Sequence, residues 1–284
     1  MNEAEADLPA RYGTGTANNV LNVTRAQKNT VIALKTRVYL VMGKYAEVIT
    51  EANKLVPATA PFTAPTGVQY NLEPSVAAVY SNDVNTEVML VSPFTTTDAP
   101  GTQNQMGYYY TWAGTGNLEY PLNTNAPGVY ANPQWGDDDA RKTQLTAVDA
   151  QVGTYTTKYS GVSPFIDWVP LIRYAEVLLN LAEAEAEVGS QERAIALLQA
   201  VHNRSDATWS YTGTSKLELI NSILTERRIE LLAEGFRAND IVRRGLPILS
   251  RGAGTATAPA SIASDDSRYI LPIPTSETTT NNDI

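Results

Sequence analysis

The segment 226–245 mixes carboxylates and guanidinium groups with apolar residues. Glu226, Glu230 and Glu234 recur at every fourth position, so on a helix they would line one face. Acids and arginines at this density serve either proton-transfer chemistry or ion pairs that tie helices together. We interpret the segment as an ion-pair lattice. Its charged residues are Glu226, Arg227, Arg228, Glu230, Glu234, Arg237, Asp240, Arg243 and Arg244.

Two further groups could do chemistry. His202 is the only histidine, and no G-x-S-x-G turn supplies an activated serine, so we interpret it as structural. The run Asp137–Asp139 could bind calcium, but its spacing differs from that of an EF-hand and Arg141 follows closely. We favour a local ion-pair turn there. No pair of carboxylates stands out as the acid and base of a glycosidase, so we predict no catalytic residue.

Aromatic side chains between positions 108 and 135 are the residues that we predict to bind a ligand. They lie in a loop rich in Gly and Asn, and Tyr120 follows within the same loop. Flat aromatic faces stack on the apolar faces of sugars, and amides meet sugar hydroxyls. The alternative is that the rings fill a small core beneath a long loop. The predicted glycan-binding residues are Tyr108, Tyr109, Tyr110, Trp112, Tyr130 and Trp135.

The composition restricts the class of protein. The chain has 284 residues, a formal net charge of −9 and no cysteine. The acidic balance argues against a nucleic-acid binder. The absence of cysteine excludes disulfides, thiolate catalysis and cysteine-ligated metal. We expect no cofactor and metal-independent binding. No apolar run reaches the ~20 residues of a membrane span.

Helical periodicity predicts the elements that position these residues. Apolar positions three and four apart over 25–57 predict two helices separated by Gly43, and the same pattern recurs from Leu171 to Val201 around Gly189. Helix, glycine turn and helix are typical of tetratricopeptide units. Ser215 and Glu218 form a capping box that opens a further helix. We expect a mainly α fold of tetratricopeptide-like hairpins with a long loop-rich insertion over 58–163. The insertion carries a little β structure, with candidate strands at 87–91 and 155–159.

Four segments carry a resemblance to a known family. They are Ala33–Leu40 with Gly43–Ala46, the segment WVPLIRYAEVLLNLAE at 168–183, the charged segment 226–245 and the segment YILPIP at 269–274. In this order they resemble the SusD/RagB family of outer-membrane nutrient-binding lipoproteins. The resemblance implies a SusD-like α–α superhelix and a single domain over 1–284 that is short at its N-terminus. Its sub-regions would be 25–57, 58–163, 164–245 and an extended C-terminal segment 246–284.

The resemblance also implies a function. It implies non-catalytic binding of an oligosaccharide or other nutrient at the cell outer-membrane surface, with delivery to a SusC-like TonB-dependent transporter. It implies membrane association through a lipid anchor that this chain lacks, and no nucleic-acid partner. One alternative is a helical-repeat scaffold that binds a protein or peptide. A second alternative is a glycoside hydrolase.

Overall fold

The computed structural model of the protein describes residues 1–15, 17–101, 105–114, 117–250 and 260–281. The fold is mainly helical, with tetratricopeptide-like hairpins and a loop-rich insertion that carries short strands, which confirms the predicted fold class. The elements are α1 (Asn2–Asp7), α2 (Val20–Thr24), α3 (Lys28–Val41), α4 (Tyr45–Ala52), α5 (Val76–Ser81), β1 (Val88–Ser92), α6 (Met106–Tyr110), η1 (Val129–Ala131), α7 (Ala140–Gln144), β2 (Thr146–Asp149), β3 (Gly153–Thr156), β4 (Val169–Arg173), α8 (Tyr174–Val188), α9 (Gln191–Asn203), α10 (Lys216–Glu230), α11 (Arg237–Arg243) and α12 (Thr275–Thr280).

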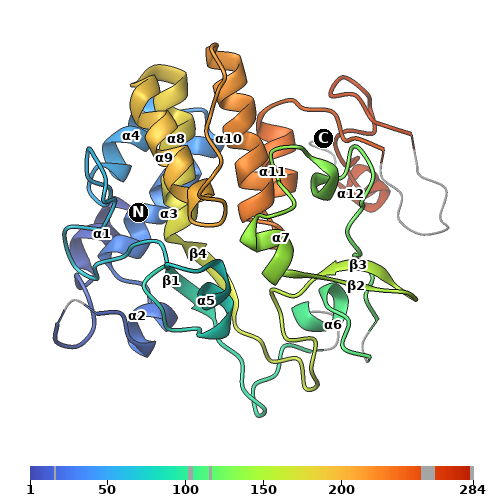
Figure 1. Cartoon of the computed structure of the whole chain (residues 1–284), viewed down its shortest axis with the longest axis horizontal. Coiled ribbons are helices and arrows are strands. Elements are labelled where there is room, and N and C mark those ends of the chain that lie inside the picture. Colours follow the sequence, from blue (N-terminus) through green and yellow to red (C-terminus); the bar gives the residue numbers. More distant parts are fainter. Residues whose placement is uncertain (16, 102–104, 115–116, 251–259, 282–284) are drawn as a thin grey trace.

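Helix α8 lies at the centre of the helical part. It packs against α9, α4, α10 and α3, and every residue from Tyr174 to Ala186 is buried. Its leucines and alanines pack against these neighbours. Its buried Glu176, Glu183 and Glu185 are compensated by Arg37, Arg243 and Arg193, respectively. Figure 1 shows α8, α9 and α10 side by side, with α6, β2 and β3 gathered on the other side of the molecule.

Two glycines make the hairpin turns at the predicted positions, for different physical reasons. Gly43 separates α3 from α4 and has a φ of +68°, a conformation that favours glycine. Gly189 separates α8 from α9, and a Cβ there would lie 1.9 Å from the Glu185 carboxylate and 3.1 Å from Ile49. The second turn is therefore crowded mainly by the Glu185 carboxylate of its own hairpin, and Ile49 of the other hairpin lies close as well.

The strands connect the insertion to the helical part. β1 pairs antiparallel with β4, and β2 pairs antiparallel with β3. The predicted strand at 87–91 is confirmed as β1, shifted by one residue, whereas the one at 155–159 corresponds to β3, which ends at Thr156. The prediction that helix begins at Leu171 was wrong. Leu171–Arg173 belong to β4, because pairing with β1 satisfies their backbone groups before α8 begins.

The predicted ion-pair lattice is confirmed, and Glu230 is at its centre. Its carboxylate accepts hydrogen bonds from Arg204 at 2.6 Å, Arg173 at 2.9 Å and Arg141 at 3.1 Å. These arginines come from the end of α9, β4 and α7. Burial alone would raise the pKa of Glu230, but the three guanidinium groups hold it well below its ordinary value.

Glu234 joins the same lattice from outside the helix. α10 ends at Glu230 and the chain turns through 231–235, so the prediction that Glu234 continues the helix face was wrong. The turn still brings its carboxylate to Arg173 Nε at 2.8 Å and Lys158 Nζ at 2.7 Å. Tyr80 from α5 donates to it at 2.8 Å. The lattice therefore ties α10 and the turn that follows it to Tyr80, Arg141 and Lys158 of the insertion.

The C-terminal segment lies largely on the outside. Tyr269 donates its hydroxyl hydrogen to the carbonyl oxygens of Leu246 at 2.7 Å and Ile241 at 3.0 Å. By contrast, Ile270 and Leu271 are 74% and 91% exposed. In the described part of the chain, no helix combines the length and apolarity that crossing a bilayer requires.

We expect Glu230→Gln to lower the free energy of unfolding by about 3–5 kcal/mol at neutral pH, because it leaves buried arginines without their counter-charge. The depressed pKa means that this stabilisation is fully present above the unfolded-state pKa of about 4.3 and is lost as pH falls through the folded-state value. The difference between the variant and the wild type should therefore shrink in acid. Urea denaturation followed by circular dichroism at several pH values measures it.

The matched control is Glu192→Gln, which removes an exposed carboxylate from the first turn of α9. It should change the free energy of unfolding by less than about 0.5 kcal/mol. A Glu230→Gln protein as stable as this control would contradict the role assigned to the lattice.

Candidate functional site

Helix α6 presents three of the predicted ligand-binding tyrosines in different directions. Successive residues of a helix are rotated by about 100°, so consecutive rings cannot form one flat surface. The Tyr108 ring meets Phe165 edge to face at 5.2 Å and Tyr109 at 5.1 Å. Tyr110 turns the other way, towards Tyr120. The structure therefore brings Tyr108, Tyr109 and Tyr110 into one cluster without placing them on one face.

Tyr120 completes this cluster. Its ring stacks on Tyr110 with centroids 5.1 Å apart and an interplanar angle of 29°. Its backbone N–H donates to the Tyr109 carbonyl at 3.3 Å, which fixes the returning chain against α6. Tyr120 is 53% exposed, so part of its ring faces solvent while Tyr110 supports it from behind. Burial, with the neighbouring Tyr120 phenol, raises the pKa of Tyr110.

The remaining predicted residues lie elsewhere. Tyr130 and Trp135 form their own edge-to-face pair at 5.5 Å, with the Lys142 ammonium 4.7 Å from the Tyr130 ring centroid. Trp135 is only 2% exposed and packs with Val129, so its ring face is covered. Trp112 is half-buried just beyond α6. The six predicted residues thus divide into the three tyrosines of α6, Trp112 just beyond that helix, and a separate Tyr130–Trp135 pair.

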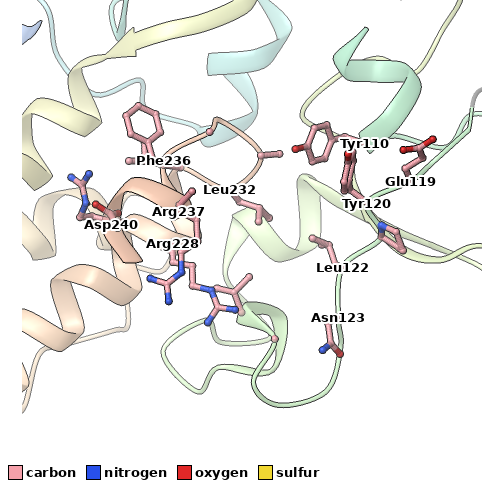
Figure 2. Close-up of a pocket in the computed structure, with 18 residues that line it drawn as sticks. Tyr110, Glu119, Tyr120, Leu122, Asn123, Arg228, Leu232, Phe236, Arg237 and Asp240 are labelled. Carbon is pink, nitrogen blue, oxygen red and sulfur yellow. The ribbon is translucent and has the colours of Figure 1, made fainter. Parts of the chain in front are cut away.

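Two cavities flank the Tyr110–Tyr120 stack. The first, of about 610 Å³, lies between this stack and residues 227–240, as Figure 2 shows. The second, of about 590 Å³, lies on the side of Tyr109 and Phe94. Tyr110, Glu119 and Tyr120 line both cavities, and we call these three residues the ridge. Cavities of this size match those that hold small ligands.

The first cavity has apolar and charged parts. Leu232 and Phe236 contribute apolar surface, and Arg228, Arg237 and Asp240 contribute charge. Burial alone would raise the pKa of Asp240, but the guanidinium groups of Arg227 and Arg243 hold it below its ordinary value. Asp240 is therefore an ionised partner of those arginines near neutral pH.

The other sequence candidates have structural environments. His202 is fully buried, with Nδ1 2.6 Å from the Glu226 carboxylate and its ring stacked on Trp209 at 4.1 Å. This confirms a structural histidine. The ion-pair turn is also confirmed, because Lys142 pairs with Asp137 at 2.9 Å and Asp139 caps α7. The part of the chain that the structure describes contains no group of three or more His, Asp or Glu residues placed to hold a metal ion.

Sequence reasoning missed the second wall of the first cavity. Arg228 and Arg237 were assigned to the lattice together with their neighbours, yet both line the cavity. The sequence contains part of the information that distinguishes these arginines. Arg227 and Arg228 are adjacent, so on a helix their side chains point about 100° apart and cannot have the same partners in the lattice. Tyr120 was noticed in the aromatic loop but was not placed in the site.

Comparisons with known proteins identify the class of this helical-hairpin scaffold. The sequence profile of the SusD family matches residues 36–284. The chain therefore belongs to the SusD family.

Individual relatives share the fold over most of this chain. A SusD superfamily protein from Bacteroides fragilis superimposes with a TM-score of 0.77 at 28% identity, over 95% of this chain and 59% of its own. Surface glycan-binding protein A from Bacteroides thetaiotaomicron, solved in complex with laminarihexaose, gives 0.60 at 16% identity, over 84% and 57%. SusD-like protein P38 of Formosa agariphila is 40% identical over 92 residues, which are 29% of this chain and 18% of that protein. The chain thus spans less than two thirds of the length of these relatives.

We expect Gly128→Ala to disturb the wall of the first cavity. A Cβ at Gly128 would lie 2.0 Å from the Asn123 carbonyl oxygen and 2.7 Å from that of Asn125, so the loop must open. The free energy of unfolding should fall by about 1–3 kcal/mol, as measured by urea denaturation. Gly101→Ala is the control, because a Cβ at Gly101 meets nothing within 4 Å. Equal stability of the two variants would contradict the tight loop.

Proposed function

We propose that the protein binds a glycan across the ridge between the two cavities. The observation that carries this proposal is the half-exposed Tyr120 ring, supported from behind by Tyr110 and flanked by cavities of ligand size. A sugar ring can place its apolar C–H face on such a ring while its hydroxyls reach polar groups along the cavity walls. Asn123 supplies an amide on the wall of the first cavity.

Within this proposal the predicted residues have distinct roles. Tyr109 and Tyr110 line the cavities and contact the ligand, and Tyr108 supports them from α6. Trp112 contacts a longer glycan beyond the end of α6. Tyr130 and Trp135 act indirectly, because they pack behind Val129, which lines the first cavity.

The biological role that we propose is nutrient capture at the cell outer membrane. The protein would hold the glycan without cleaving it and deliver it to a SusC-like TonB-dependent transporter, while a lipid anchor keeps it at the surface. Membership of the SusD family supports this role. So do the descriptions of fold relatives, one as a laminarin-binding SusD-like protein and one as a surface glycan-binding protein.

The alternative of a glycoside hydrolase has weaker support. Hydrolysis needs a carboxylic acid that keeps its proton near neutral pH to protonate the leaving group. Asp240, one of the two carboxylates lining the first cavity, has a lowered pKa and is held by Arg227 and Arg243. This environment keeps Asp240 ionised as a counter-ion of the two arginines, so Asp240 has no proton to give to a leaving group.

We expect Tyr120→Ala to weaken glycan binding about 10-fold, which corresponds to the loss of one stacking contact. Isothermal titration calorimetry against a panel of neutral and acidic oligosaccharides measures the affinity. Tyr120→Phe is the matched control, because it keeps the ring face and should bind nearly as the wild type does.

Two results would count against the proposal. Unchanged affinity of Tyr120→Ala would remove the ridge from the binding site. New reducing ends after incubation with the bound polysaccharide would indicate hydrolysis and replace the binding role with an enzymatic one.

A further inference from the structure

The second cavity differs from the first in the chemistry of its lining. The first cavity is lined by both carboxylates and arginines. In the second, Glu119 is the one formally charged residue among the described residues of the lining. Most of the remaining lining is aromatic or apolar, and its rings belong to Phe94, Tyr109, Tyr110 and Tyr120. The second cavity is therefore a largely aromatic space with a carboxylate at its edge.

The tyrosine rings of this cavity form a corner. Tyr109 and Tyr120 have ring centroids 6.4 Å apart and ring planes inclined by 61°. A small cation in such a corner can lie within about 6 Å of both centroids, the range in which a cation is attracted to a ring face. The attraction arises because the face of an aromatic ring carries the negative part of its quadrupole. Tyr110 stacks on Tyr120 and holds that ring in place.

Glu119 supplies a counter-charge beside this corner. The Asn117 side chain donates a hydrogen bond to its carboxylate, which orients the group. A carboxylate has about four acceptor positions, so it can also accept hydrogen bonds from a ligand. Figure 2 shows Glu119 on the side of Tyr120 that is away from Arg237. The formal net charge of −9 on the whole chain also favours the approach of a cation.

We infer that the second cavity recognises an organic ammonium group, which in a glycan is the protonated amine of an amino sugar. This inference rests on the proposed function, because it assigns a substrate class to one side of the same ridge. The ammonium group lies in the corner between the Tyr109 and Tyr120 rings and donates to the Glu119 carboxylate. An acetylated amine carries no charge, so it gains neither the attraction to the rings nor the ion pair.

A matched pair of oligosaccharides tests the inference. One member is an oligosaccharide of glucosamine, and the other is the same compound with its amino groups acetylated. At a pH of about 6 the free amines are protonated. We expect calorimetry to give an affinity about 3- to 30-fold higher for the amine form, from one cation–π contact and one exposed ion pair. The preference should weaken as sodium chloride is raised and as a pH of about 9 removes the proton.

Variants assign the preference to residues. Glu119→Gln should reduce it while the acetylated form still binds. Tyr109→Leu should also reduce it, whereas Tyr109→Phe keeps the ring and should retain it. Glu192→Gln is the control, since Glu192 is exposed and lines neither cavity. Thermal unfolding monitors whether each variant folds. If Tyr109→Leu disturbs α6, Glu119→Gln alone provides the test.

A small ammonium probe separates this inference from the proposed function. Choline and its neutral isostere 3,3-dimethylbutan-1-ol are titrated separately at constant ionic strength. Binding is followed by nuclear magnetic resonance of labelled methionine methyl groups, of which the chain has 4. Met106 lines the second cavity, and Met42 at the turn between α3 and α4 is the internal control. Choline should shift the Met106 signal and leave that of Met42 unchanged, and its neutral isostere should bind more weakly.

A choline preference that Glu119→Gln loses supports the ammonium site even if no oligosaccharide binds, a case in which only the proposed function fails. Equal affinity for choline and its neutral isostere would overturn the inference. So would choline binding that leaves the Met106 signal in place, equal affinity for the amine and acetylated oligosaccharides, or an amine preference that survives in Glu119→Gln.

Discussion

The structure depends on one requirement, that the buried carboxylates of Glu226, Glu230 and Glu234 be matched by buried cations. Removing one partner of such a group leaves a charge without compensation in a low-dielectric interior, which is strongly destabilising. The cations come from segments far apart in the sequence, so satisfying the carboxylates also assembles the fold. Lys158 is one example: it donates to the Glu230 carbonyl at 2.8 Å as well as to Glu234. The next residue, Tyr159, lies behind Tyr110 with ring centroids 6.3 Å apart. The lattice thereby helps to set the position of the ridge.

The local features of the fold could be predicted from the sequence because their causes are local. Helical periodicity located the hairpins, and the capping box at Ser215 and Glu218 marked the start of α10 as the structure has it. Predictions failed where a distant segment decides the conformation. Leu171–Arg173 form a strand because β1 lies beside them. Glu234 leaves the helix, yet still reaches Arg173, because the turn at 231–235 redirects the chain.

The candidate site could be predicted only in part, for a related reason. Residue type indicated that tyrosines of the loop would bind a ligand, but spacing along the chain does not say which rings meet. Tyr110 pairs with Tyr120, ten positions away, and Trp135 enters the interior beside Ile229. The arginines of one segment are similarly divided. Arg227 and Arg228 both line the first cavity, but Arg227 donates to Asp240 whereas Arg228 donates to the Pro127 carbonyl. Membership of the SusD family accounts for the hairpin scaffold, and the binding site that we propose is argued from these particular side chains.

We propose that the helical scaffold presents the ridge and the facing α10–α11 wall to a glycan. Hydrogen–deuterium exchange of the intact chain, with and without a bound oligosaccharide, tests it most directly. We predict slower exchange on binding at residues 106–114, 117–122 and 227–240, with little change in α3, α4, α8 and α9. Protection confined to those four hairpin helices would contradict the account and favour a scaffold that binds its partner through the helical repeats.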